Sequence, residues 1–284
     1  EEVFGDFRDT GNEPAVYFKS VHHLYKEVNA EPLVRPPWYF DTSVQGEGVT
    51  DVATHLVDLA QWMIGRDRGA EHTSDVVLTA ARQWPTEIPL DVFSRITGLD
   101  TFPAASQVDV RGGVLQYLCN AKINYTLRGV PVEVDVIWDL AIPAGGGDTH
   151  YGILRGERAN LIVDQGAHTG FETRLCVLPV TTCRGFAQAL EDALSAMRDA
   201  FPGTGYRTCE ISWADSASVP IASADPGFEI TIPVAMHQGH EARFAEVLNQ
   251  FLGYVNAGTW PQRVSEELVA KYTLLAKAYE LSHR

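Results

Sequence analysis

The strongest constraint on the fold of this chain is a run of alternating residues in its middle. Every second residue from position 130 to position 136 is a valine, namely Val130, Val132, Val134 and Val136. The residues between them are Pro131, Glu133 and Asp135. Side chains of a β-strand point alternately to opposite faces, so this pattern predicts a strand with one buried face.

Other segments extend this strand into a predicted sheet, because they are rich in β-branched and aromatic residues. Strands are expected at 75–82, 107–111, 114–127, 130–136, 149–155, 160–164, 173–179, 207–213 and 228–234. Helices are expected at 14–29, 49–64, 185–200, 240–257 and 262–282. The first of these rests on Pro14 at a helical start and on the spacing of the apolar residues Val16, Phe18, Val21, Leu24, Tyr25 and Val28.

Two helices, a run of strands and then helices is an α+β order, not the strict βαβ alternation of a nucleotide-binding fold. We therefore expect one large, mostly antiparallel open sheet with helices on one face. The other face is then free, and an apolar sheet face of that size is usually buried against a partner.

Charge and hydropathy exclude several classes of partner. The chain has 284 residues and a formal net charge of −15, which argues against binding nucleic acid or an anionic membrane surface. No apolar run approaches the roughly 20 residues needed to span a bilayer. A small-molecule ligand is more compatible with this negative charge and hydropathy.

The cysteines point to neither a metal nor a disulfide framework. Cys119, Cys176, Cys183 and Cys209 form no C-x-x-C pair and no His/Cys cluster with zinc spacing. Cys119 and Cys176 lie in apolar, strand-like segments, so we predict that both are buried free thiols.

The segment from Gly46 to Gly65 carries the candidate chemistry. On a helical wheel Asp51, His55, Asp58 and Trp62 form one stripe, and most of the remaining circumference is apolar. A carboxylate one turn from a histidine orients the ring and raises its affinity for a proton, which suits a general base. The same stripe is also consistent with a plain solvent face, with acids near the helix N-terminus for dipole reasons.

Other candidates carry two interpretations as well. His22 and His23 lie in the predicted helix 14–29, where adjacent side chains point about 100° apart and chelate poorly. His237, His240 and Glu241 offer metal ligands, but their position at a helix start favours capping. Two sets of residues are candidates for the wall of a substrate site or for ordinary packing: His150 at the head of a strand, and Trp38, Tyr39 and Asp41 after a proline-rich turn.

The pattern Gly46-Glu47-Gly48, Asp51, His55, Asp58, Trp62 and Gly65 resembles the signature of the Gfo/Idh/MocA oxidoreductases, a glycine-rich turn followed by D-x-x-x-H-x-x-D on a helix. Further stretches resemble a narrower group of oxidoreductase C-terminal domains. These are 20–24, 35–41, 150–156 and 239–244.

This resemblance implies a sheet domain like the C-terminal domain of glyceraldehyde-3-phosphate dehydrogenase. Residues 1–284 would form the substrate-binding and dimerisation domain, and a Rossmann domain binding NAD or NADP would be absent from this chain. His55 matches the family's proton-transferring histidine and Asp51 the aspartate that orients it. Asp58, Trp38, Tyr39, Asp41 and His150 are the substrate-side candidates, and family members pair through the free sheet face as homodimers or tetramers.

Three hypotheses of function follow. The first is the substrate half of an NAD(P)-dependent enzyme that oxidises a sugar or polyol hydroxyl, inactive as this chain alone. The second is a non-catalytic module of the same fold that binds carbohydrate or protein. The third and weakest is a metal-assisted hydrolase or isomerase using Asp51, His55 and His240. The cytoplasm is the favoured location, with the bacterial envelope as the alternative if a signal was removed.

Overall fold

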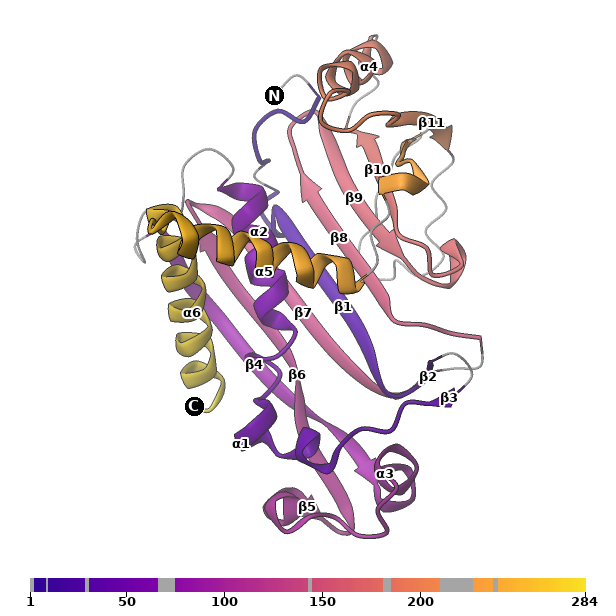
Figure 1. The fold of residues 1–284 in the computed structure, drawn as a ribbon, viewed down its shortest axis with the longest axis vertical. Helices are drawn as coiled ribbons and strands as arrows, with labels where there is room; N and C mark the ends of the chain where they lie inside the picture. The colour runs from indigo at the N-terminus through magenta and orange to yellow at the C-terminus, as the bar shows by residue number, and fades with distance from the viewer. Residues whose placement is uncertain are drawn as a thin grey trace.

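A large mixed sheet dominates the computed structural model (Figure 1). The structure describes residues 3–8, 10–28, 31–65, 75–142, 145–180, 185–209, 227–236 and 240–284. Ten described strands form the sheet in the order β11-β12-β10-β9-β8-β1-β7-β6-β4, with β5 paired to β6. The strands are β1 (Val16–Tyr25), β4 (Val76–Pro89), β5 (Val110–Arg111), β6 (Val114–Leu127), β7 (Val130–Ala141), β8 (Thr149–Arg155), β9 (Ala159–Gln165), β10 (Arg174–Pro179), β11 (Gly205–Cys209) and β12 (Gly227–Thr231).

The described strands of this sheet pair antiparallel, apart from β1 and β7, which run parallel. Parallel neighbours need a long crossover connection, and here residues 26–129 separate the two strands. The short strands β2 (Glu27–Val28) and β3 (Glu31–Pro32) pair in a separate ribbon at the start of this crossover.

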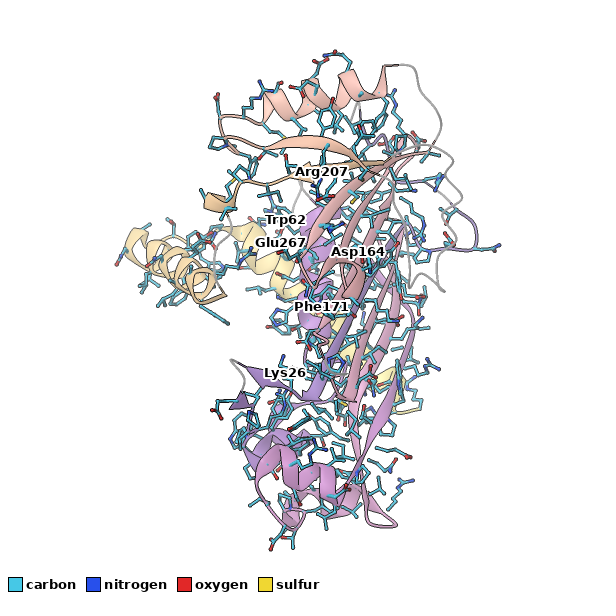
Figure 2. The ribbon with its side chains drawn as sticks, turned by 90° about the vertical axis from the view of Figure 1, so that its right-hand side faces the viewer. Lys26, Trp62, Asp164, Phe171, Arg207 and Glu267 are labelled. Carbon is cyan, nitrogen blue, oxygen red and sulfur yellow. The ribbon has the colours of Figure 1, made fainter. Side chains whose placement is uncertain are left out.

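The helices lie on one face of the sheet, as the side view in Figure 2 shows. Helix α2 packs on β6, β7 and α6, and α6 packs on β4. The α-helices are α1 (Thr42–Gln45), α2 (Ala53–Ile64), α3 (Leu90–Thr97), α4 (Phe186–Ala196), α5 (His240–Ala257) and α6 (Gln262–Ser282). Short 3₁₀ turns are η1 (Pro37–Phe40), η2 (Ala104–Asp109), η3 (Ala167–Thr169) and η4 (Val234–Met236). The predicted α+β fold, an open and mostly antiparallel sheet with helices on one face, is confirmed.

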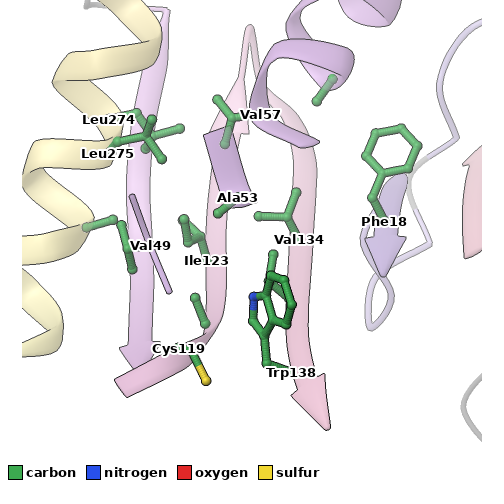
Figure 3. Close-up of a cluster of buried hydrophobic side chains, with 14 of the residues drawn as sticks. Phe18, Val49, Ala53, Val57, Cys119, Ile123, Val134, Trp138, Leu274 and Leu275 are labelled. Carbon is green, nitrogen blue, oxygen red and sulfur yellow. The ribbon is translucent and has the colours of Figure 1, made fainter. Parts of the chain in front are cut away.

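The main core lies between this helical layer and the strands β1, β7 and β6 (Figure 3). Val132, Val134 and Val136 are almost fully buried there, so the predicted one-sided strand is confirmed. The intervening Asp135 lies on the free face and is nevertheless buried, because Tyr17 Oη donates a hydrogen bond of 3.0 Å to it and Lys122 Nζ lies 3.3 Å away.

The predicted helix at 14–29 is wrong, because residues 16–25 form strand β1. Consecutive residues of β1 such as Val16, Tyr17 and Phe18 are all buried, so side chains on both faces of the strand are covered and the two-residue alternation is weak. The spacing of its apolar residues imitates a helical period as a result. His22 and His23 therefore lie on a strand, where adjacent side chains leave opposite faces.

Smaller differences occur at element ends. Helix α2 begins at Ala53, four residues later than predicted, because 49–52 form a turn. Residues 104–109 are a 3₁₀ turn, so only Val110–Arg111 remain of the strand predicted at 107–111. Of the strand predicted at 207–213, residues 210–213 lie outside the described part, and β12 ends at Thr231 rather than at 234.

Cys119 and Cys176 are buried free thiols, as predicted. Burial raises the pKa of the Cys119 thiol to about 12, so this group is protonated at neutral pH. Cys209 is half-buried and free, and Cys183 lies outside the described residues. Among the helices that the structure describes, none combines the length and hydropathy required to cross a bilayer.

Substitution of Gly48 tests the contact that seats α2 on the sheet. A methyl group at Gly48 would lie 2.6 Å from the backbone of Cys119 and Asn120, so Gly48→Ala should lower the free energy of unfolding by about 1–3 kcal/mol. Urea unfolding measures the loss. Gly253→Ala is the matched control, because nothing lies within 4 Å of a carbon added there. Equal stability of the Gly48→Ala and Gly253→Ala variants would contradict the packing argument.

Candidate functional site

The turn before α2 fixes where this helix begins. Gly46 ends α1 with a φ of +90°, a conformation that residues with a Cβ atom rarely adopt. The N–H of Gly48 donates to the carbonyl of Leu118 on β6 at 3.0 Å, and the N–H of Val49 donates to Gln83 Oε1 at 2.9 Å. These two hydrogen bonds tie the turn to β6 and to β4, so the first residues of α2 are positioned over the sheet.

The polar stripe of this helix faces away from the sheet. Ala53, Val57 and Ala60 are buried against the sheet, whereas Trp62 is 56% exposed. Asp51 is half-buried just before the helix, and the ring of His55 is exposed one turn later. The helix is therefore one-sided, with its acidic and imidazole groups on the side away from the core.

Asp51 is the electrostatic centre of the site. Burial raises the pKa of its carboxyl group, and the nearby His22, His55 and Arg35 oppose that rise. Gln45 Nε2 also donates to its Oδ1 at 3.4 Å. A carboxylate that is partly withdrawn from water beside two imidazoles is suited to orient a histidine and to stabilise its protonated form.

A second group of polar side chains lies on the same face of the sheet, on β1 and β8. Ser20 and His22 are two residues apart on β1, and Ser20 pairs with His150 in the register of β8. Ser20 Oγ lies 2.6 Å from His22 Nε2 and 2.8 Å from His150 Nδ1, so one buried hydroxyl joins two imidazoles.

Asp148 anchors this group. Its carboxylate lies 2.7 Å from Lys26 Nζ, 3.1 Å from His23 Nδ1 and 3.5 Å from His22 Nδ1. Figure 2 shows Lys26 beyond the end of β1. Burial acts to raise the pKa of Asp148, but hydrogen bonds from His22, Lys26 and His23 hold that pKa well below its usual range. Burial and the neighbouring His22 lower the pKa of His150.

Arg35 and two aromatic rings form the wall beside these histidines. Arg35 donates to the carbonyls of Leu24 and His23 at 2.8 and 2.9 Å. Its guanidinium carbon lies 4.5 Å from the ring centroid of Tyr39 and 5.3 Å from that of Trp138. Trp138 is 7% exposed, and among the described residues its indole N–H has no hydrogen-bond partner.

The structure brings together some of the predicted site residues. Asp51 and His55 influence each other electrostatically, and so do Asp51 and Tyr39. His150 joins this group through Ser20 and His22. These four predicted residues come from three separate parts of the chain.

The remaining predicted site residues have other contacts. Asp58 forms an ion pair with Lys271 on α6 at 2.8 Å. Asp41 caps α1, accepting from the N–H of Ser43 at 3.0 Å and from its hydroxyl at 2.6 Å. Trp38 is 53% exposed on η1. His237 and the side chains of His240 and Glu241 lie outside the described residues.

Sequence reasoning did not name Ser20, Asp148 or Arg35 as site residues, and it considered His22 only as part of a helix. The helix predicted at 14–29 concealed the pairing of Ser20 with His22, because residues two apart share a face only on a strand. The pattern of a serine and a histidine two residues apart, in a segment rich in aromatic and β-branched residues, was the available signal. Within the described residues, no three His, Cys, Asp or Glu side chains are arranged to hold a metal ion.

The fold and the site define a class of protein. It is an α+β sheet domain in which an aspartate and a histidine lie at the start of a helix that follows a glycine turn. Residues 1–283 match the family described as "Putative oxidoreductase C terminal domain", and the chain belongs to this family. A comparison with curated proteins gives no match.

Solved structures with a similar fold include a "putative oxidoreductase" from Parabacteroides merdae, which is 33% identical with a TM-score of 0.90. The match covers 99% of this chain and 62% of that one, so the chain spans less than two thirds of this relative. A 3-ketoreductase from Actinomadura kijaniata in complex with NADP is 11% identical with a TM-score of 0.29, over 64% of this chain and 44% of its own. A Gal80p mutant from Saccharomyces cerevisiae is 12% identical with a TM-score of 0.31, over 67% and 46%.

Replacement of Asp148 tests the anchor of the histidine group. Its pKa is lower in the folded chain than in the unfolded chain, so it stabilises the fold above the unfolded-state pKa of about 4. That stabilisation is lost as the pH falls through the lower folded-state pKa. Asp148→Asn should therefore cost roughly 1–3 kcal/mol at pH 7, and this difference from wild type should persist to pH 5 and shrink below pH 4.

Denaturant unfolding at several pH values measures this difference. Asp139→Asn is the control, because Asp139 is exposed on β7 and surface substitutions usually change stability by less than about 0.5 kcal/mol. A difference for Asp148→Asn that already disappears near pH 6 would show that another group provides the stabilisation.

Proposed function

We propose that this chain is the substrate-binding and oligomerisation half of an NAD(P)-dependent oxidoreductase that acts on a sugar or polyol hydroxyl by hydride transfer. The observation that carries the proposal is the half-buried carboxylate of Asp51 beside His55, on a helix that follows a glycine turn. Membership of an oxidoreductase C-terminal domain family supports the reaction class.

In this proposal His55 accepts the proton of the substrate hydroxyl as the carbonyl forms. Asp51 orients the ring and stabilises the imidazolium, because a partly buried carboxylate interacts more strongly with a cation than one in open water does. His55 is exposed in this chain, so water must be excluded by a further surface opposite α2. A preceding nucleotide-binding domain would supply that surface.

The residues of this chain do not fit a dinucleotide. A dinucleotide-binding turn joins a strand to the N-terminus of a helix, whereas the glycine run Gly145–Gly147 leads into β8. We therefore assign no cofactor contact to the described residues, and in this proposal a separate nucleotide-binding domain would set the choice between NAD and NADP.

The substrate wall in this proposal consists of Tyr39 and His150, which lie in the same group of side chains as Asp51. Aromatic rings such as Tyr39 and Trp38 provide apolar faces against which the C–H groups of a sugar can pack. To bind substrate, Asp58 would have to give up its ion pair with Lys271. Asp41 would have to give up its hydrogen bonds at the start of α1. These two residues are accordingly the weaker members of the set.

Replacement of His55 tests the assignment of the base. In the full-length protein, His55→Ala should lower turnover by about 10²–10⁴-fold and leave the affinity for NAD(P)H unchanged, because the ring acts on the substrate. Steady-state kinetics and a nucleotide fluorescence titration measure the two effects. His168→Ala is the control, because His168 pairs with Asp164 outside the group around Asp51. Loss of nucleotide affinity together with turnover would contradict the role of His55.

A second candidate function is a non-catalytic module that binds carbohydrate or protein. The exposure of His55 and of the ring of Trp38 favours it, because both are accessible without any further domain. Determining the sequence encoded upstream of residue 1 in the natural gene would distinguish the two functions. A strand followed by G-x-G-x-x-G and a helix supports the enzyme, and an unrelated domain supports the module.

The face of the sheet opposite the helices is the proposed oligomer interface. Val21 and Ile137 are cross-strand neighbours on this face, and both are half-buried, with Lys19 and Tyr151 beside them. An apolar centre with a polar surround is typical of protein interfaces, and we propose a homodimer or tetramer through it.

A charged residue at Ile137 tests this interface. Ile137→Asp should raise the dimer dissociation constant at least about tenfold, since burying an unpaired carboxylate costs well over 1.4 kcal/mol. Analytical ultracentrifugation measures the constant. Ala187→Asp, at an exposed position on α4, should leave it unchanged. A monomeric wild-type protein, or equal constants for the two variants, would rule out this face.

A further inference from the structure

The connection between His22, Ser20 and His150 has a defined hydrogen-bond direction. A serine hydroxyl carries one proton, so Ser20 donates to one imidazole and accepts from the other. His22 Nδ1 faces the carboxylate of Asp148 and therefore carries a proton. In the neutral ring His22 Nε2 is then the acceptor, Ser20 donates to it, and His150 Nδ1–H donates to Ser20.

This arrangement leaves one nitrogen of the chain of hydrogen bonds open. His150 Nδ1 is engaged by Ser20, and among the described residues His150 Nε2 has no hydrogen-bond partner. That nitrogen is consequently a lone-pair acceptor on a half-buried ring. Burial and the adjacent His22 lower the pKa of His150, so the ring is neutral at physiological pH and able to accept a proton.

We propose that His150, Ser20 and His22 form a proton relay in the site, with His150 Nε2 as its acceptor and Asp148 as its anchor. A bond forms between an incoming proton and His150 Nε2. The Nδ1 proton of His150 then passes to Ser20 Oγ, and the hydroxyl proton of Ser20 passes to His22 Nε2. The net result is one proton gained and one positive charge, located on His22.

The surroundings of His22 favour that final position of the charge. Asp148 lies 3.5 Å from His22 Nδ1, and Asp51 is close enough to interact with the ring electrostatically. The indole of Trp138 lies with its ring centroid 4.9 Å from that of His22, and an aromatic face stabilises a neighbouring cation. Lys26 and Arg35 are the cations that face this group, and each has its own partners.

This inference rests on the proposed function only for the origin of the proton. The relay supplies a second proton acceptor in addition to His55, on β8 rather than on α2. His150 is then a catalytic residue, and Ser20, His22 and Asp148 are positioning residues that act through it.

Nitrogen-15 NMR of histidine-labelled chain tests the relay without any substrate. In the wild-type protein near pH 8, both His22 and His150 should carry their proton on Nδ1. A wild-type spectrum in which His150 carries its proton on Nε2 would overturn the proposal, so the test does not depend on any variant folding.

Substitution of Ser20 tests the connection itself. Ser20→Ala removes the acceptor for His150 Nδ1–H, so the Nε2–H form of His150 should appear. Ser20→Thr retains a hydroxyl and should restore the wild-type tautomer. His283, which bonds the carbonyl of Tyr279 at the C-terminus, is the internal reference and should not change. An unchanged His150 spectrum in Ser20→Ala would overturn the relay.

The two sets of results separate the relay from the proposed function. The expected tautomers together with full activity of His55→Ala would retain the relay and reject the assignment of His55. Loss of activity in His55→Ala without the expected tautomers would retain His55 and reject the relay.

Discussion

The close contact of the Gly48 turn with β6 is the constraint on which the site depends. Because Gly48 has no side chain, its backbone reaches the carbonyl of Leu118, and α2 begins directly above the sheet. The small buried residues of α2, Ala53 and Ala60, let the helix lie close to the strands. Asp51 thus comes within electrostatic reach of His22, which is 29 positions earlier in the chain. Larger residues at Gly48, Ala53 or Ala60 would move α2 away from the strands, and the carboxylate of Asp51 away from His22.

The parallel pair β1–β7 is the second requirement. It places Ser20 beside Val136 and His22 beside Trp138, while the antiparallel pair β1–β8 places Ser20 beside His150. Strand β1 therefore meets two strands that lie more than about a hundred residues later in the chain. Long-range pairing of this kind has a high entropic cost before its contacts form. The extensive apolar core on both sides of β1 offsets that cost.

Sequence patterns predicted those strands and helices whose formation depends on residues close together in the chain. The bounds of β6, β8, α5 and α6 agree with the prediction, because each has a clear period and a turn residue at its end. Asp51 and His55 were found because both lie in the predicted helix 49–64. Strand β1 was missed because burial on both faces removes its alternation, and the shared face of Ser20 and His22 was missed with it. Asp41, before the motif, caps α1, and Asp58, within the motif, pairs with Lys271 of α6, and no pattern of spacing shows either contact.

Strand β1 also connects two surfaces of different chemistry. Ser20 and His22 point toward the helices, whereas Lys19 and Val21, one residue away, lie on the face proposed for a partner. On that free face Lys122 pairs with Glu133 and Asp135. The carboxylates of Asp148 and Asp51 face the imidazoles on the helical side, where a negative charge stabilises a protonated histidine. A partner bound to the free face would contact the backbone of the strand that carries Ser20, so any shift of β1 caused by assembly would alter the hydrogen bonds of the site.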